Sequence, residues 1–163
     1  MDVLRSAALL AATVTMGLSA GLFYTYACSI MRGLRICDDR TFVVMMQRFN
    51  VTILNGWFAI GFAGALLLTL LAAALHLAVG GAVLASTVGA LVLYGAVIVI
   101  TGTVNVPLNN ALDAAGEPAD AADAAVTRAR FETRWVRWNV ARAVLSTAAL
   151  ACLAWALALH GAS

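Results

Sequence analysis

The stretch Thr101-Gly-Thr-Val-Asn-Val-Pro-Leu-Asn-Asn110 ends the third of four long apolar runs, and it places Asn105 and Asn109 on either side of Pro107. An asparagine amide costs free energy in hydrocarbon unless its donors and its acceptor are bonded. Pro107 has no N–H to donate, so it also leaves the carbonyl of Thr103 without its helical partner. The stretch therefore predicts a cluster of polar groups at one depth, with partners at the other helix ends on the same side.

The composition is that of an integral membrane protein. The chain has 163 residues, of which 63% are hydrophobic and 11% charged, far outside the range of soluble domains. Crossing a hydrocarbon core of ~30 Å takes about 20 residues, and four apolar runs are long enough: 4–31, 51–76, 81–104 and 140–159. Since backbone groups in lipid must be bonded within their own segment, we predict an all-α fold, a four-transmembrane-helix bundle forming a single domain over 1–163.

The positive charges predict the orientation. All ten basic residues are arginines; apart from Arg5 they lie in the first connection, in the third connection and at the start of the last run. By the positive-inside bias we expect both connections in the cytoplasm, each with a short interfacial helix, and both termini outside a cell membrane. A net charge of +2 gives no indication of nucleic-acid binding.

The metal-binding residue types are scattered. Cys28, Cys37 and Cys152 form no C-x-x-C pair, and none of their spacings suits a metal. His76 and His160 lie at the ends of their runs away from the polar stretch, where we expect them to be solvated or interfacial. We therefore predict no metal, haem or flavin.

Arg142 lies inside the fourth apolar run, where an ionised arginine is tolerated mainly when it faces the bundle and finds acceptors. In one interpretation it bonds the carbonyls freed near Pro107 and the side-chain oxygens of Asn105 and Asn109. In another it binds an anionic or carbonyl-bearing ligand. A third interpretation has it reaching out to the interface. Helical spacing puts it on one face with four other residues: Phe131, Trp135, Trp138 and Asn139.

Together these motifs resemble the DUF1772 family of small four-helix membrane proteins, which includes the fungal anthrone oxygenases. The resemblance extends over nearly the whole chain. It rests on these segments, in order: Gly21-Leu-Phe-Tyr24, Met31-x-Gly33-Leu34, Gln47-Arg-Phe-Asn50, Asn105-x-Pro107-x-Asn109 and Trp135-x-x-Trp138-Asn139-x-x-Arg142.

The resemblance implies an oxygenase that acts on a hydrophobic polycyclic phenol or ketone with dioxygen and without a metal or flavin. Such a reaction passes through an enolate, which the protein must stabilise while excluding water. The candidates for binding the oxyanion are Arg142, Asn105, Asn109 and Asn139. The candidates for contacting a flat substrate are Tyr24, Asn50, Phe131, Trp135 and Trp138. For proton removal there are three candidates: Glu132, Tyr24 and the substrate's own acidity. Pro107 is expected to have a structural role.

Other functions stay open. The same pocket would suit a cofactor-free cyclase or isomerase of a lipophilic polyketide or terpenoid. A carrier or small transporter would be indicated by internal repeats or by broken helices in matching halves, and the sequence shows neither. A non-enzymatic accessory subunit would use the outer helix faces rich in Ala and Gly. The G-x-x-x-G of Gly17 and Gly21 permits close helix packing, which we place within the bundle, with a homo-oligomer as the alternative.

Overall fold

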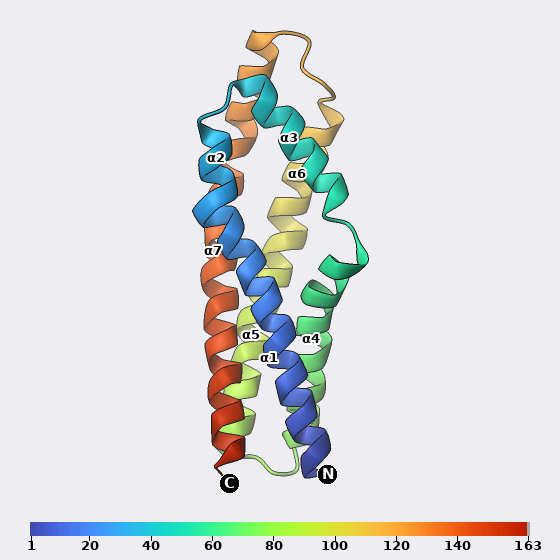
Figure 1. The fold of residues 1–163 in the computed structure, drawn as a ribbon, viewed down its shortest axis with the longest axis vertical. Helices are drawn as coiled ribbons and strands as arrows, with labels where there is room; N and C mark the ends of the chain where they lie inside the picture. Colours follow the sequence, from blue (N-terminus) through green and yellow to red (C-terminus); the bar gives the residue numbers. More distant parts are fainter. Residues whose placement is uncertain (163) are drawn as a thin grey trace.

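The computed structural model describes residues 1–162, and their helices form an elongated bundle with both termini at one end (Figure 1). The first span is continuous from α1 (Asp2–Thr25) through a π-helical turn, η1 (Tyr26–Ile30), to α2 (Met31–Arg35). A separate helix, α3 (Asp39–Thr52), follows. Asp38 caps its first turn by accepting from the Thr41 backbone and hydroxyl, and these bonds hold the pKa of the Asp38 carboxyl below its usual range.

The second and third spans are α4 (Gly56–His76) and the continuous run of α5 (Gly81–Ile100), a second π-helical turn, η2 (Thr101–Asn105), and α6 (Val106–Ala114). Only a tight turn joins the two spans. There Gly80 and Gly81 have φ of 69° and 71°, a conformation that favours glycine. The last helix, α7 (Ala121–Gly161), begins at a cap in which Asp120 accepts from the backbone of Asp123.

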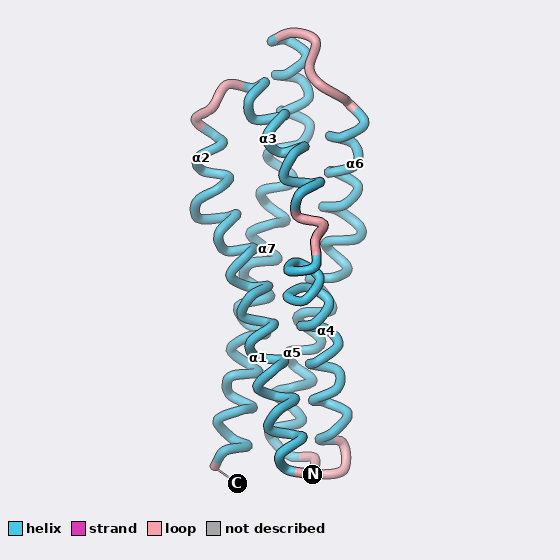
Figure 2. Tube along the Cα trace, turned by 45° about the vertical axis from the view of Figure 1, so that its right-hand side comes forward, coloured by secondary structure: helices cyan, strands magenta, loops and turns pink. Residues whose placement is uncertain are grey.

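The expected four-helix membrane architecture is confirmed: four helices of 34, 21, 34 and 41 residues are long and apolar enough to cross a membrane. No strand occurs within residues 1–162. Around the bundle α1 packs between α4 and α7, and α5 also packs between α4 and α7. At the end away from the termini, α3 and α6 lie against the N-terminal part of α7 (Figure 2).

The helix boundaries differ from the sequence prediction in three places. The third span does not end at residue 104, because the chain passes Pro107 through a π turn and continues as a helix to Ala114. The second begins at Gly56 and not at 51, because Asn55 caps α4 by accepting from the backbone of Phe58. In the third connection the expected interfacial helix is the first part of α7 itself.

Near the termini the bundle consists of close packing between small side chains. Ala12, Ala65, Ala90 and Ala149 are fully buried, and nearby threonines such as Thr69 bond back to their own helix. His76 is buried here against the ring of His160, with Nδ1 2.8 Å from the Ala72 carbonyl. Of the two expected settings, solvated or interfacial, the solvated one is therefore wrong for His76, because the bundle closes over its ring.

Candidate active site

A cavity of about 270 Å³ lies in the other half of the bundle, where α3 and α6 meet α1, α4 and α7. Its walls are largely aromatic and aliphatic, and its polar groups come mainly from η2, α6 and α7. The principal lining side chains are Phe23, Tyr26, Phe49, Asn50, Phe58, Phe62, Thr101, Asn105, Asn109, Asp113, Trp135, Asn139 and Arg142. The volume lies just below the range of ~300–1,000 Å³ typical of sites for small molecules.

Helix α7 supplies Trp135, Asn139 and Arg142, which are spaced to share one helical face. All three are buried, and Arg142 is 6% exposed. Because Arg142 is buried and contacts Phe23 of α1 and Thr101 of η2, its guanidinium is held inside the bundle and not at a lipid-facing surface. The interpretation in which Arg142 reaches outward to the interface is therefore excluded.

The partners of Arg142 are neutral. Its Nη1 donates to the Thr101 hydroxyl at 3.3 Å, and its Nη2 donates to Oδ1 of Asn139 at 3.1 Å. The guanidinium carbon lies 4.5 Å from the centre of the Phe23 ring, at cation–π distance. No carboxylate within residues 1–162 pairs with it, and its Nε–H is buried without a hydrogen-bond partner. A buried positive charge with an unused donor favours an electronegative ligand.

Asn105 is the cavity side chain with the most unused hydrogen-bonding capacity. It is 1% exposed, and neither its amide nitrogen nor its amide oxygen has a hydrogen-bond partner. Leaving a buried polar group unpaired costs about 1–3 kcal/mol. Arg142 therefore does not bond the Asn105 oxygen, in contrast to the structural interpretation of the sequence.

The other two asparagines predicted to lie here are bonded. Asn139 donates to the Phe23 carbonyl at 3.1 Å while its oxygen accepts from Arg142. The oxygen of Asn109 accepts from the indole N–H of Trp135 at 2.8 Å. These two amides fix the positions of Arg142 and Trp135, so the unused hydrogen-bonding capacity is concentrated at Asn105 and at Nε of Arg142.

Both π-helical turns border the cavity, and π turns are frequent at functional sites. In η2 the Val106 N–H bonds back to the Thr101 carbonyl, five residues earlier, directly before Pro107. This turn presents Thr101 and Asn105 to the cavity. In the first span, η1 begins at Tyr26, whose ring lies 5.6 Å from that of Trp135. Three residues before Tyr26, the Phe23 carbonyl accepts from Asn139.

Hydrogen bonds join α3 to α6 along one side of the cavity. Asn50 donates to the Asp113 carboxylate at 3.3 Å. One turn earlier on α3, Gln47 donates to the carbonyls of Leu112 and Gly116. Asp113 follows Asn109 by four residues and Asn105 by eight, so the three share one face. It is the one carboxylate among the lining residues in the described part of the chain.

The profile of the anthrone oxygenase family matches residues 41–152. The chain belongs to the anthrone oxygenase family. No curated protein and no solved structure matches it. The matched range contains Asn50, Asn105, Asn109, Trp135, Asn139 and Arg142, whereas the α1 wall of the cavity precedes it.

Four residues that the sequence places in the site lie outside the cavity of this anthrone oxygenase family member. Tyr24 is 62% exposed on the outer surface of α1, because Phe23 and Tyr26 continue the buried face. Trp138 is half-buried and does not line the cavity. Phe131 lies behind Trp135, stacked on its ring at 5.9 Å. Glu132 is turned to Arg128 and accepts from its Nε at 2.6 Å.

Pro107, which the sequence assigns a structural role, is exposed at the start of α6.

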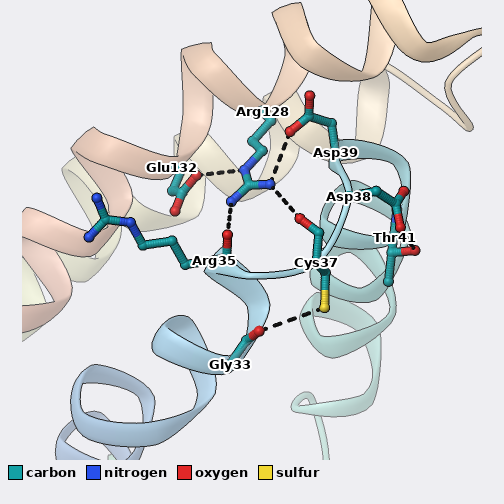
Figure 3. A network of polar contacts seen from close by, with 8 residues as sticks. All are labelled: Gly33, Arg35, Cys37, Asp38, Asp39, Thr41, Arg128 and Glu132. Carbon is teal, nitrogen blue, oxygen red and sulfur yellow. Dashed lines mark hydrogen bonds and ion pairs between the residues drawn. The ribbon is translucent and has the colours of Figure 1, made fainter.

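Arg128 forms a clamp between α7 and the turn from α2 to α3 (Figure 3). Its guanidinium donates to the carboxylates of Glu132 and Asp39 and to the carbonyls of Arg35 and Cys37, at 2.6 to 3.1 Å. It also lies 4.4 Å over the Phe42 ring. Glu132 is therefore part of an ion-pair network that holds the helices together.

Sequence reasoning missed Tyr26 and Asp113. The buried positions of α1, Ser19 and Phe23 among them, continue by helical spacing to Tyr26, so periodicity contained that signal. Asp113 continues the face of Asn105 and Asn109. Within residues 1–162, no three His, Cys, Asp or Glu side chains are grouped to hold a metal ion. The absence of a cofactor from the reaction stays a prediction.

Proposed function

We propose that this protein uses dioxygen to oxidise the activated methylene of a flat phenolic ketone of the anthrone type, held in the cavity. The observation that carries the proposal is the pair of unsatisfied groups, the Asn105 amide and Nε of Arg142, in two residues that line a largely aromatic and aliphatic cavity. A buried polar group without a partner in the protein requires an explanation, and a ligand that completes its hydrogen bonds is one. A hydrophobic molecule with one electronegative oxygen fits this combination.

The aromatic walls favour a planar ligand. Phe23, Tyr26, Phe58 and Trp135 surround the space, and aromatic side chains contact flat rings by offset stacking or edge-on packing. The indole of Trp135 is fixed by its bond to Asn109 and by the Phe131 ring behind it. The platform is therefore in place before a ligand arrives, which reduces the ordering cost of binding.

At the polar end, the substrate oxygen would accept from Nε of Arg142 and from the Asn105 amide. Enolisation concentrates negative charge on that oxygen. A fixed cation and amide in a largely apolar site stabilise the enolate more than the neutral ketone, and this difference accelerates the reaction. The neutral partners of Arg142 leave its charge uncompensated until the enolate forms.

We assign proton removal to Asp113, in place of Glu132. Asp113 lines the cavity and is positioned by Asn50, whereas Glu132 is engaged with Arg128. The carboxylate takes a methylene proton, and the enolate transfers one electron to dioxygen. Recombination of the two radicals and return of the proton give a hydroperoxide. Loss of water then leaves a ketone, so that CH₂ and O₂ become C=O and H₂O.

We place the cavity end of the bundle in the cytoplasm. The first and third connections carry most of the arginines and lie at that end (Figure 1), in agreement with the positive-inside bias. A lipophilic substrate made in the cytoplasm would then reach the cavity from the inner leaflet or directly from the cytoplasm.

The test is turnover of anthrone by purified protein in detergent under ¹⁸O₂, with oxygen uptake and product mass measured together. We expect one mole of O₂ consumed per mole of anthraquinone, with one labelled oxygen atom in the product. Turnover of a related polyketide without oxygen uptake would instead indicate a cyclase or isomerase. The absence of turnover or binding across a panel of polycyclic phenols would contradict the proposal.

A further inference from the structure

Three arginines on the outside of the bundle have no partner. Arg32 and Arg35 of α2 and Arg137 of α7 line one pocket between the two helices. Within residues 1–162 none of their guanidinium groups makes a hydrogen bond or ion pair. Arg35 offers only its backbone carbonyl to Arg128, while its side chain points away from that residue (Figure 3).

The carboxylate in this pocket does not neutralise the three charges. Glu132 lines the same pocket, but its carboxylate is 2.6 Å from Nε of Arg128. The pocket is therefore strongly positive. Three arginines that line one pocket from two helices offer enough donors for the several oxygens of a phosphate group.

An apolar groove continues from this pocket along the bundle between α1 and α7. Ala27, Arg32 and Val140 line both the pocket and the groove, so the two are continuous. The first span contributes Tyr24, Ala27 and Cys28 to the groove, and the side chains of α7 that line it are small or aliphatic. Along α7 they are Ala143, Val144, Thr147, Ala148 and Ala151.

The length of the groove matches one leaflet of a bilayer. From Val140 to Ala151 the helix rises about 16 Å, at ~1.5 Å per residue. Half of a ~30 Å hydrocarbon core is about 15 Å. Arg137 lies one turn beyond Val140 on the side away from the groove, which puts its charge at the headgroup level when the groove lies along an acyl chain.

We propose that this continuous surface binds an anionic phospholipid, with the phosphate between Arg32, Arg35 and Arg137 and one acyl chain in the groove. An anionic headgroup is selected because a zwitterionic lipid brings a cation into a pocket that already holds three unpaired positive charges. An arginine near an anionic surface contributes about 1 kcal/mol, or roughly fivefold in affinity. The site is separate from the cavity and does not depend on the proposed reaction.

The experiment compares lipids on the purified protein by native mass spectrometry, with melting temperature in detergent as a second readout. Phosphatidylglycerol should remain bound and raise the melting temperature, whereas phosphatidylcholine of the same chain length should do neither. Glycerol phosphate, which has the headgroup without chains, should bind far more weakly. Equal retention of the two lipids, or equal affinity for glycerol phosphate, would overturn the proposal.

Variants locate the site. Replacing Arg32, Arg35 and Arg137 together by Gln should weaken phosphatidylglycerol binding roughly a hundredfold. Arg134→Gln, which removes an exposed arginine of the same helix outside the pocket and groove, should leave it unchanged. If the triple variant does not fold, Arg137→Gln alone should lower affinity about fivefold. Ala148→Phe should obstruct the groove and weaken lipid retention without removing charge. Unaltered binding in the arginine variants would assign the lipid to another surface.

Discussion

Arg128 and Arg142 lie on one face of α7, about four turns apart, and their surroundings differ in kind. Arg128 donates through all three nitrogens and has two carboxylates within 3.0 Å. Arg142 is more deeply buried, has only neutral partners and keeps one donor unused. A charge that is fully paired within the protein stabilises the fold, whereas a buried charge left unpaired is available for a ligand. The comparison indicates that Arg128 is structural and that Arg142 belongs to the site.

The largest expected effect is on turnover at Arg142. Arg142→Lys keeps the charge but loses the planar set of donors, so turnover should fall by about 10²–10³, corresponding to roughly 2.7–4 kcal/mol, as for loss of an oxyanion-hole donor. Oxygen uptake with anthrone measures it. Arg134→Lys, on the outer surface, is the matched control. Full activity in a folded Arg142→Lys protein would remove Arg142 from the chemistry.

Substitutions at two carboxylates test the same contrast between the cavity and the Arg128 clamp. Asp113→Asn should lower turnover about 10²-fold, the lower end of the range for a general base, and activity should recover as pH rises and the substrate ionises in solution. Glu132→Gln should leave turnover nearly unchanged, since Glu132 pairs with Arg128 outside the cavity. Pre-steady-state kinetics of enolate formation would check both. The reverse pattern, with Glu132 needed and Asp113 dispensable, would contradict the assignment.

Breaking the clamp should affect stability. Arg128→Ala leaves Glu132, Asp39 and two backbone carbonyls without their donor, at a cost of about 3 kcal/mol, the low end for a buried pair because Asp39 is partly exposed. Thermal unfolding in detergent measures the loss. Turnover per folded molecule at low temperature should stay within a few-fold of wild type. An unchanged melting temperature would show that the clamp is not structural.

A smaller effect is expected at Trp135. Trp135→Phe keeps an aromatic platform but removes the indole N–H that Asn109 accepts, which should cost about 1 kcal/mol of stability. Affinity for anthrone should fall only slightly because stacking is retained. Comparing melting temperatures with and without ligand separates the two contributions. A loss of turnover as large as that in Arg142→Lys would instead indicate that Trp135 takes part directly in the reaction.

Much of this arrangement could be predicted from the sequence. Hydropathy gave the four spans, and helical spacing put Trp135, Asn139 and Arg142 on one face because α7 is regular there. The spacing of Arg128 and Glu132, four residues apart, already indicated an ion pair, and that signal outweighs the interpretation of Glu132 as a base. The π turns could not be predicted, because a local change of backbone hydrogen bonding leaves no periodic pattern. They decide how the third span passes Pro107 and which side chains flank it.

The most direct test concerns the unmet hydrogen bonds of Asn105. Asn105→Leu is compared with Asn139→Leu, since both amides are buried in one cavity but only Asn139 is bonded. If Asn105 is reserved for a ligand, the Asn105→Leu variant should melt at or above the wild-type temperature. The melting temperature should rise by about 2–4 °C for each ~1 kcal/mol of the unpaired amide's cost that is removed. Anthrone should no longer raise the melting temperature of this variant. Asn139→Leu should melt several degrees lower. Equal destabilisation by the two substitutions, with ligand stabilisation intact in Asn105→Leu, would contradict the account.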